Sequence, residues 1–584
     1  MAKHDTLADF TTDRRVLILS AMAVVVGAIG AVVAYALVWL IAVITNLAYY
    51  QRFSPAFVSP AGHHLGAWSV LVPVAGGLVI GLMARFGSEK IRGHGIPEAL
   101  EAILIGRSRI EPKVAVLKPV SSAISIGTGG PFGAEGPIIM TGGAFGSLFA
   151  QFFHLSGAER RTLLVAGAAA GMSAIFASPM AAVLLSVELL LFEWKPRSFI
   201  PVSVASVVAA ALRVPLLGAG PIFPAPFHAP LQMKGLFFAL LVGLIAGLGS
   251  GLLTSLVYGF EDLFLKLPIH WMWWPIIGGL FIGLGGLFDP RVLGVGYDTI
   301  NLLILGKLVG ISVLGLLIGK ALVWSIALGS GTSGGVLAPL LMMGGALGAL
   351  EAPWIPVGDA GLWAMVSMAA MMGGTMRSPL TAIVFTLELT HDINLLPALL
   401  VGCVAAHAMT VLLLRRSILT EKVARRGHHL VREYTVDPFE IHRVEEVMDK
   451  NVPTIPSTMT VAELSRNISA GDPVGQRQGT PIVNEKGELA GIITRSDLMK
   501  AMERTREQVS VLQAGTASVV VGYPDELLRD AVRRMLDHGI GRLPIVEREN
   551  PKRLVGYLGR AGVMAARVRM FEEEHLRERG RAAR

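Results

Sequence analysis

The chain has 584 residues, of which 53% are hydrophobic and only 16% are charged, and its mean hydropathy is +0.59. A typical soluble domain carries about 25% charged residues, so the composition excludes a disordered or ordinary soluble protein and indicates a membrane protein. The formal net charge of +8 does not indicate a nucleic-acid partner, because Lys and Arg are scattered among apolar runs.

The N-terminal stretch, residues 1–15, is polar and ends in Arg14 and Arg15, which predicts a cytoplasmic N-terminus by the positive-inside rule. The uncharged run from Val16 to Gln51 is much longer than the about 7–15 apolar residues of a signal peptide. Roughly 20 residues already span a bilayer. We therefore expect a first, long, tilted membrane helix and no cleaved signal.

Further charge-free stretches, at 235–260, 321–350 and 393–414, are each long enough to cross a bilayer. Gly and Pro interrupt other apolar segments, notably around 93–97, 127–137 and 329–339. Broken segments at membrane depth are tolerated only where they are buried in protein or line a cavity. The sequence therefore predicts a membrane body over residues 16–415 that contains broken helices.

The membrane body contains an internal repeat. GTGGPFGAEGPIIMTGGAFG at 127–146 matches GSGTSGGVLAPLLMMGGALG at 329–348, and SPMAAVLLSVEL at 178–189 matches SPLTAIVFTLEL at 378–389. The two copies are 202 residues apart in the first match, counted from Pro137 to Pro339, and 200 apart in the second, counted from Pro179 to Pro379. We interpret the body as two copies of one half, over about 16–215 and 230–415.

Beyond residue 415 the composition changes to that of a soluble protein, and basic residues follow the last apolar run. The same positive-inside rule predicts that this part is cytoplasmic. TPIVNEKGELAGIITRSDLMKA at 480–501 resembles LPIVERENPKRLVGYLGRAGVMAA at 543–566, and each reads as strand, turn, strand and amphipathic helix. We expect a linker at 416–443, α/β units at 444–505 and 506–570, and a charged tail at 571–584.

Three Gly-rich stretches in the membrane body are candidate anion sites, the first being GHGIPEAL at 93–100. A Gly-rich approach to a helix start leaves free backbone N–H groups at the positive end of the helix dipole. Many transporters build a substrate site from duplicated broken helices near the bilayer midplane. Close-packed helix crossings also use small residues, but three such stretches, two of them duplicated, favour a site.

Ionisable residues inside apolar segments are costly and are functional by default. Glu135 is the sharpest case, because its duplicate is Leu337 and it has no neighbouring Lys or Arg. It is a candidate proton acceptor. Glu188 and Glu388 form a matched pair near segment ends, and we interpret them as hydrogen-bonding partners of helix ends.

Enzyme motifs also occur in the second repeat, but they are weak. Residues 329–334 satisfy GxGxxG and residues 331–335 satisfy GxSxG around Ser333. Neither follows a soluble strand in a βα unit, as those motifs require. A membrane hydrolase is therefore only a second hypothesis. The single cysteine, Cys403, excludes an intrachain disulfide and a Cys-based metal site.

These motifs together resemble the CLC family of chloride channels and chloride/proton antiporters. GHGIP resembles the family's GSGIP, GAEGP at 133–137 resembles G(R/K)EGP, and GVLAP at 335–339 resembles GxFxP. The C-terminal part resembles a CBS-domain pair. The resemblance implies an all-α polytopic membrane protein with inverted-repeat halves and broken helices, a cytoplasmic α/β CBS pair, and a homodimer with one anion pathway per subunit.

The resemblance assigns Glu135 as the gating residue and proton acceptor. His94 stands in place of the family's anion-coordinating serine, Leu419 in place of its tyrosine, and Leu189 in place of the inner proton-transfer glutamate of many antiporters. The implied anion-binding set is His94, Gly95, Ile96, Gly133, Ala134, Gly136, Gly335, Val336, Leu337 and Leu419.

In the CBS pair, Thr494 resembles a phosphate-contacting residue and Asp497 a ribose-contacting residue. Gly559 and Gly562 stand at these positions in the second unit, so the sequence predicts at most one adenine-nucleotide site. A purely structural dimerisation module is an equal alternative. No cofactor is required and no metal site is expected.

The sequence thus favours a passive, gated chloride channel, regulated by a cytoplasmic CBS pair, in the inner membrane of a bacterium. A chloride/proton antiporter is the close alternative, because Glu135 supplies an outer proton acceptor while Leu189 cannot relay a proton. A membrane-anchored enzyme or nucleotide sensor is more distant. The expected partners are chloride, protons in the antiporter case, membrane lipid and a second copy of the chain.

Overall fold

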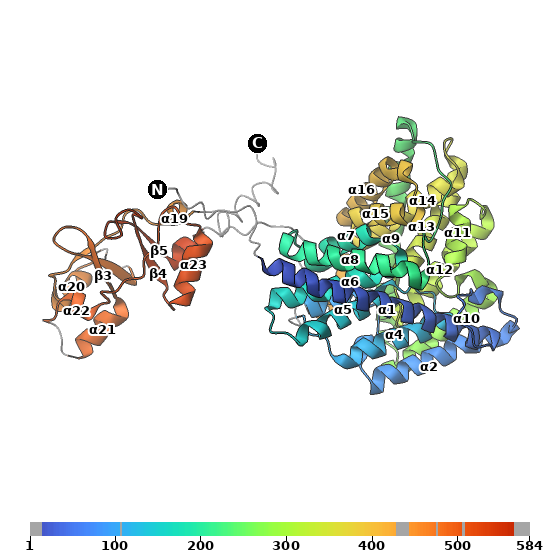
Figure 1. Cartoon of the computed structure of the whole chain (residues 1–584), viewed down its shortest axis with the longest axis horizontal. Coiled ribbons are helices and arrows are strands. Elements are labelled where there is room, and N and C mark those ends of the chain that lie inside the picture. The colour runs from blue at the N-terminus through green and yellow to red at the C-terminus, as the bar shows by residue number, and fades with distance from the viewer. Residues whose placement is uncertain are drawn as a thin grey trace. The chain divides into compact units, whose positions relative to one another are not determined.

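The computed structural model describes residues 14–104, 108–427, 443–472, 474, 477–504 and 508–565. It divides the chain into two compact units, Met1–Glu433 and Tyr434–Arg584 (Figure 1). Most of the expected N-terminal segment and of the expected linker, and all of the expected tail at 571–584, lie outside the described residues.

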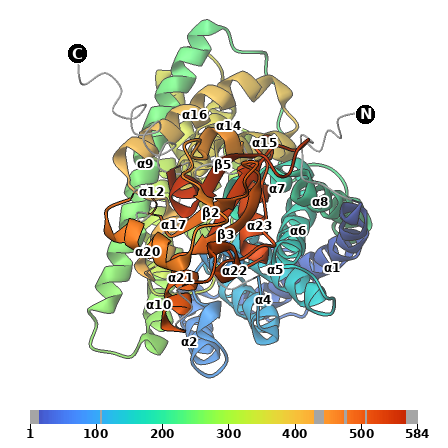
Figure 2. The same ribbon diagram turned by 90° about the vertical axis from the view of Figure 1, so that its left-hand side faces the viewer.

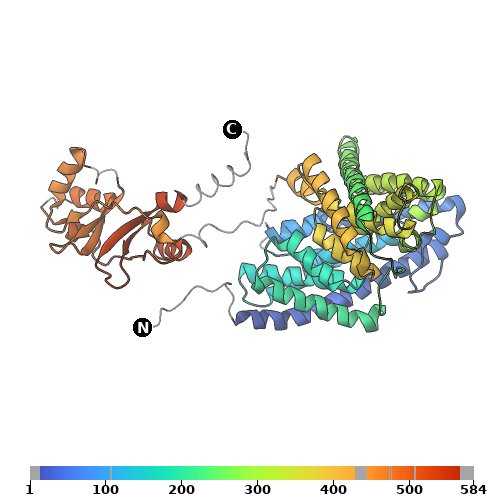
Figure 3. The ribbon, with the colours of Figure 1, turned by 90° about the horizontal axis from the view of Figure 1, so that it is seen from above.

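The first half of the membrane body begins with one helix of 36 residues, as the uncharged run predicts. Its main helices are α1 (Arg15–Tyr50), α2 (Leu71–Phe86), α3 (Ile96–Leu104), α4 (Pro112–Gly127), α5 (Glu135–Gln151), α6 (Gly157–Phe176), α7 (Pro179–Leu185) and α8 (Pro196–Leu217). Helix α1 packs against α6 and α8, and α8 runs beside it along one edge of the body (Figure 3).

The second half repeats this alternation of long and short helices. Its helices are α9 (Met233–Leu265), α10 (Trp274–Phe288), α11 (Tyr297–Ile304), α12 (Ile311–Gly329), α13 (Leu337–Glu351), α14 (Ala360–Met376), α15 (Pro379–Thr390), α16 (Leu396–Leu413) and α17 (Ile418–Arg425). The long helix α9 packs against α12, α14 and α16 (Figure 2). Among the described residues, seven helical segments are long and apolar enough to cross a membrane.

The charge-free stretch at 321–350 is two helices and not one span. Helix α12 ends at Gly329 and α13 begins at Leu337. Gly331 between them has φ +81°, a backbone conformation that favours glycine. The break therefore falls in one of the Gly-rich stretches, whereas the stretch at 235–260 lies wholly within α9.

Two structural matches reflect the duplication. Ala177 and Arg377, each just before a helix that starts with Pro, both have left-handed backbone, with φ of 53° and 56°. Glu188 accepts hydrogen bonds from the backbone N–H groups of Leu380 and Thr381, at 3.3 and 2.8 Å, at the start of α15. Each repeat thus presents the same local geometry at the same place.

Glu388 makes the reciprocal contact. It accepts hydrogen bonds from the N–H groups of Met180 and Ala181, at 2.9 and 2.8 Å, at the start of α7. A helix N-terminus has unpaired N–H groups and attracts negative charge. Each glutamate therefore caps a helix of the other repeat, the helix-end role that the sequence predicts.

The C-terminal unit contains two small sheets. The strands are β1 (Ile455–Pro456), β2 (Gly479–Val483) and β3 (Leu489–Thr494) in one sheet and β4 (Arg542–Val546) and β5 (Leu554–Gly559) in the other. Strands β2 and β3 pair antiparallel, as do β4 and β5, with a register shift at the same relative place in both pairs. The helices are α19 (Val444–Val447), α20 (Val461–Ser469), α21 (Arg495–Glu503), α22 (Val511–Ala514) and α23 (Leu528–Asp537).

The two cores of this unit draw on both sides of residue 505. Val444 packs with Leu528, Leu543 and other residues of the second module, whereas Val511 packs with the first. The start of each expected unit therefore packs in the core of the other unit, and the two modules are intertwined.

Candidate anion site

The three Gly-rich stretches meet in space, and the two duplicated ones do so directly. Gly133 and Gly335 form an antiparallel bridge, with Gly335 N–H donating to Gly133 O at 2.8 Å and Gly133 N–H to Gly335 O at 3.3 Å. Gly334 N–H donates to Gly93 O at 3.4 Å. The starts of α3, α5 and α13 therefore converge inside the membrane body.

This convergence requires glycine. A Cβ at Gly136 would lie 1.8 Å from the carbonyl oxygen of His94, and one at Gly95 would lie 2.5 Å from the carbonyl oxygen of Gly136. A Cβ at Gly335 would lie 2.5 Å from the carbonyl oxygen of Gly133. The absence of side chains lets the helix starts approach closely, so close packing and the candidate anion site involve the same residues.

Glu135 is the first residue of α5 and is completely buried. Its Oε1 accepts a hydrogen bond from Ala338 N–H, at 3.2 Å, in the first turn of α13. Its Oε2 has no hydrogen-bond partner among the described residues. The carboxyl group therefore lies between the two repeats, at a helix start whose first N–H groups have no partner within the helix.

Tyr297, the first residue of α11, also belongs to this neighbourhood, because it is close enough to interact electrostatically with Glu135. Sequence reasoning missed it, although the duplication offered a signal, because Gly294, Gly296 and Tyr297 repeat the spacing of Gly93, Gly95 and Ile96.

The remaining predicted residues at the duplicated loops are buried helix starts. Ala134 is the N-cap of α5, Val336 is the N-cap of α13, and Leu337 is the first residue of α13. Their side chains are apolar, so they could offer an anion only their backbone N–H groups.

We call residues 93–95, in the first Gly-rich stretch, the GHG loop; it contains His94 and Gly95, and Ile96 begins α3. His94 is 4% exposed, and its Nδ1 has no partner among the described residues. Gly95 N–H donates to Glu98 Oε2 at 2.9 Å, so this N–H is already engaged. Glu98 Oε1 accepts from Arg426 Nη2, also at 2.9 Å, at the end of α17.

Leu419 is completely buried in α17, a helix that packs against α3 and α14. The hydroxyl of Tyr258, on α9, donates to the carbonyl oxygen of Ile418 beside it. A tyrosine thus supports this helix from outside, while the predicted position itself offers only an apolar side chain.

Two buried lysines bind backbone carbonyl oxygens at matching places in the two repeats, and sequence reasoning missed both. Lys118 Nζ donates to the carbonyl oxygens of Ile91 and Gly93, each at 2.8 Å. Lys320 Nζ donates in the same way to those of Val292 and Gly294, at 2.9 and 3.0 Å. The duplication was the available signal, because the two lysines are 202 residues apart, the same separation as that of Pro137 and Pro339.

Among the described residues close to Leu189 in sequence, no acidic side chain is free at the expected inner proton position. Leu189 is completely buried in a π-helical turn, Ser186–Leu191. Its neighbour Glu188 is engaged by the start of α15. Glu193 forms ion pairs with Arg161 at 3.4 Å and Arg197 at 3.7 Å.

The GxSxG hydroxyl has a packing role. Ser333 is completely buried, and its hydroxyl shares a hydrogen bond of 2.8 Å with that of Ser122 on α4. This contact joins the two repeats.

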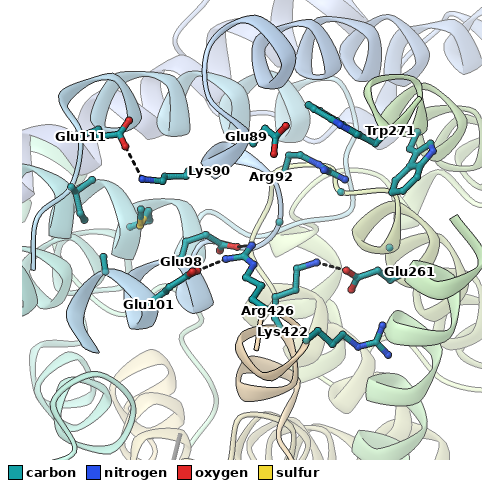
Figure 4. A pocket seen from close by; sticks show the side chains of 18 of the residues that line it. Glu89, Lys90, Arg92, Glu98, Glu101, Glu111, Glu261, Trp271, Lys422 and Arg426 are labelled. Carbon is teal, nitrogen blue, oxygen red and sulfur yellow. Dashed lines mark hydrogen bonds and ion pairs between the residues drawn. The ribbon is translucent and has the colours of Figure 1, made fainter. Parts of the chain in front are cut away.

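A cavity of about 830 Å³ opens beside the GHG loop and reaches the C-terminal end of α17 (Figure 4). Ion pairs cross its wall, among them Lys90 with Glu111 at 2.7 Å and Lys422 with Glu261. The glycines of two of the loops, Gly93 and Gly331, form part of its lining.

Thr494 and Asp497 bind each other in the C-terminal unit. Thr494 N–H donates to Asp497 Oδ2 at 3.0 Å and Asp497 N–H donates to Thr494 Oγ1 at 3.2 Å, while the Thr494 hydroxyl also donates to Asp497 Oδ2, at 2.7 Å. These contacts form a capping box at the start of α21. Among the described residues, no group of His, Cys, Asp or Glu side chains could hold a metal ion.

Comparisons with known proteins agree with this architecture. ClcB of Escherichia coli O81 (strain ED1a) and of Escherichia coli O6:H1, each named a voltage-gated ClC-type chloride channel, are 29% identical over 378 residues, which cover 63% of this chain and 90% of theirs.

Solved structures have the same fold. A slow cyanobacterial Cl⁻/H⁺ antiporter matches with a TM-score of 0.62 and 22% identity over 71% of this chain and 99% of its own. A eukaryotic CLC transporter matches with a TM-score of 0.59 and 19% identity over 94% of this chain and 98% of its own.

Two family models cover most of the sequence. One described as voltage gated chloride channel matches residues 75–411, and one described as CBS domain matches residues 444–504 and 515–569. The chain therefore belongs to the CLC family of chloride transport proteins, with a C-terminal pair of CBS domains.

Proposed function

We propose that this protein is a passive chloride channel of a bacterial inner membrane and that Glu135 is its gate. The supporting observation is the position of the Glu135 carboxyl group, which receives a hydrogen bond from Ala338 at the start of α13. A chloride ion at this place would accept a hydrogen bond from the same N–H group. Carboxylate and anion therefore compete for one site.

Protonation would open this gate. A neutral carboxyl group is a poorer acceptor and no longer repels an incoming anion. The pathway then becomes available when Glu135 takes up a proton or swings away from α13. Chloride conduction should accordingly rise as the pH on the side that Glu135 faces is lowered.

The arrangement around Leu189 favours conduction without proton coupling. Glu188 and Glu193 are the acidic residues nearest in sequence, and helix α15 and two arginines already engage them. A proton leaving Glu135 would thus find no free carboxylate at the expected inner position. Chloride would move alone.

Reconstitution in liposomes tests both parts of the proposal. We expect chloride efflux above that of empty vesicles and a reversal potential that follows chloride at any pH gradient. Glu135→Gln should give efflux that is largely insensitive to pH, because its side chain cannot titrate. Unchanged pH dependence in this variant would show that Glu135 is structural.

A chloride/proton antiporter is the second candidate, because the cyanobacterial structure that shares the fold is named as one. Uphill proton movement driven by a chloride gradient, lost in Glu135→Gln, would favour it over the channel. Vesicles without any chloride flux would leave a membrane-anchored enzyme or sensor.

For the C-terminal unit we propose a cytoplasmic regulatory role within a homodimer. An adenine nucleotide would bind near Thr494 and Asp497, whose side chains would have to exchange their mutual hydrogen bonds for the ligand. Calorimetry of the purified protein with ATP, ADP and AMP decides this point. Absence of heat, with Asp497→Ala indistinguishable, would leave the structural role.

A further inference from the structure

Arg92 has an unusual environment in the cavity beside the GHG loop. It lies two residues before His94, and its guanidinium carbon lies 4.5 Å from the ring centre of Trp271 and 5.6 Å from that of Trp274 (Figure 4). A cation over the face of an aromatic ring is attracted by the ring quadrupole, most strongly by Trp. The two rings hold the guanidinium in one place.

The third contact is with the loop of the second repeat. A Cβ at Gly331 would lie 2.8 Å from Arg92 Nη2 and 2.9 Å from Nε. Gly331 therefore leaves the space that the guanidinium occupies. This contact places the positive charge of Arg92 between the GHG loop and the GSGTSGG loop at 329–335, which belong to the first and the third of the converging stretches in chain order.

This charge lacks an acidic partner. Arg92 forms no ion pair within the part of the chain that the structure describes, and its Nε is buried without a hydrogen-bond partner. Glu89 and Glu261 act on its charge only from beyond ion-pair distance, and Glu261 is already paired with Lys422. A guanidinium has five N–H donors, and leaving buried donors unpaired is costly.

Four of the other five cations in the lining, all but the exposed Arg109, are already paired. Lys90 pairs with Glu111, Lys422 with Glu261, and Arg426 with Glu98 and Glu101. Arg92 thus supplies a fixed positive charge with free donors at the entrance to the loops. Fixed charge in a cleft raises the local concentration of the opposite ion.

We propose that Arg92 is a capture site for small inorganic anions, chloride among them, at which the ion pauses between the cavity and the three Gly-rich loops. This inference rests on the proposed chloride transport, because it places Arg92 on the same pathway. Its rigid support by two tryptophans makes it a binding residue with a defined position, in contrast to the flexible lysines of the surface.

Bromide, which replaces chloride and scatters anomalously, tests the site directly. We expect a bromide peak in contact with the Arg92 guanidinium in crystals of the wild type, and its loss in Arg92→Gln. A wild-type crystal with bromide elsewhere in the body and none at Arg92 would overturn the proposal.

Flux gives the second measurement. At low chloride and low ionic strength, Arg92→Gln should reduce efflux roughly three- to tenfold, and the difference should shrink as salt screens the charge. Arg92→Lys, which keeps the charge but not the planar donor fork, should lie between them. Lys90→Gln is the matched control, because it removes a charge of the same cavity that is exposed and ion-paired.

The outcomes separate this inference from the function on which it rests. If the wild type carries no chloride, the transport proposal fails, while the bromide peak still decides whether Arg92 binds anions. If the wild type carries chloride and Arg92→Gln, folded by thermal unfolding, matches it at low salt, Arg92 only fastens the tryptophans and the inference fails.

Discussion

The contact between the end of α17 and the GHG loop predicts that Arg426 controls the affinity for chloride. Glu98 is 6% exposed and holds Gly95 N–H with one carboxylate oxygen and Arg426 with the other. Arg426→Gln removes the positive partner and leaves the negative charge of Glu98 beside the loop. That charge would then repel an anion bound there.

The expected magnitudes follow from the geometry. Two charges 2.9 Å apart interact by roughly 5–6 kcal/mol at an effective dielectric constant of about 20. The Arg426 side chain is 35% exposed, so solvent screens much of this energy, and Lys118 and Lys422 also act on Glu98. We therefore expect a loss of about 1–2 kcal/mol in stability and a three- to tenfold weaker chloride affinity, about 0.7–1.4 kcal/mol.

The assay is calorimetric chloride binding to the purified protein, together with the chloride dependence of efflux. Glu98→Gln should act in the opposite direction, because an amide oxygen can still accept from Gly95 while the negative charge is gone; Arg426 keeps Glu101 as its partner. The double variant should lie near the wild type. Arg416→Gln is the control, since Arg416 pairs with Glu421, 3.3 Å away, and not with Glu98.

Two results would refute this reasoning. One is an unchanged chloride affinity in Arg426→Gln. The other is a weaker affinity in Glu98→Gln, which would mean that the carboxylate supports the anion through Gly95 and does not oppose it through charge.

Three further variants test single contacts. His94→Ser should change chloride affinity and its pH dependence if the imidazole donates to the ion, whereas unchanged values would show a packed histidine. Lys320→Met should lower the free energy of unfolding by about 2–4 kcal/mol, measured by thermal unfolding, because it leaves two buried carbonyl oxygens without a donor. The hydrogen bond from Arg477 holds the pKa of Asp449 below its usual value. Because the pair is exposed, it contributes under about 1 kcal/mol to the free energy of unfolding. This contribution is present above the unfolded pKa of about 3.9 and is lost as the pH falls through the folded pKa of Asp449. Hydrogen exchange of the C-terminal unit between neutral and acid pH should show this loss in the wild type and not in Asp449→Asn.

Much of the scaffold could be predicted from the sequence because its signals are local. Apolar length predicts α1, and paired Gly and Pro residues predict the broken helices and the duplication. The burial of Glu135 could be predicted too, because the apolar residues on both sides of it in the sequence keep its carboxyl group away from bulk water.

The contacts between distant segments could not be predicted in this way. Arg92 meets Trp271 across 179 residues, and Tyr258 meets Ile418 across 160. No period of 2 or 3.6 residues encodes such pairs, because they depend on how whole helices pack. The exchange of Val444 and Val511 between the two C-terminal cores has the same cause.

The comparison of the two repeats indicates where function resides. Lys118 and Lys320 have the same contacts, as do Glu188 and Glu388, so selection for the scaffold alone accounts for them. Glu135 has no acidic counterpart, because Leu337 stands at the matching place. Its carboxyl group nevertheless reaches into the start of α13, the helix that Leu337 begins. Since a symmetric scaffold needs no charge at its centre, this departure from symmetry supports the proposal that Glu135 acts on the transported ion.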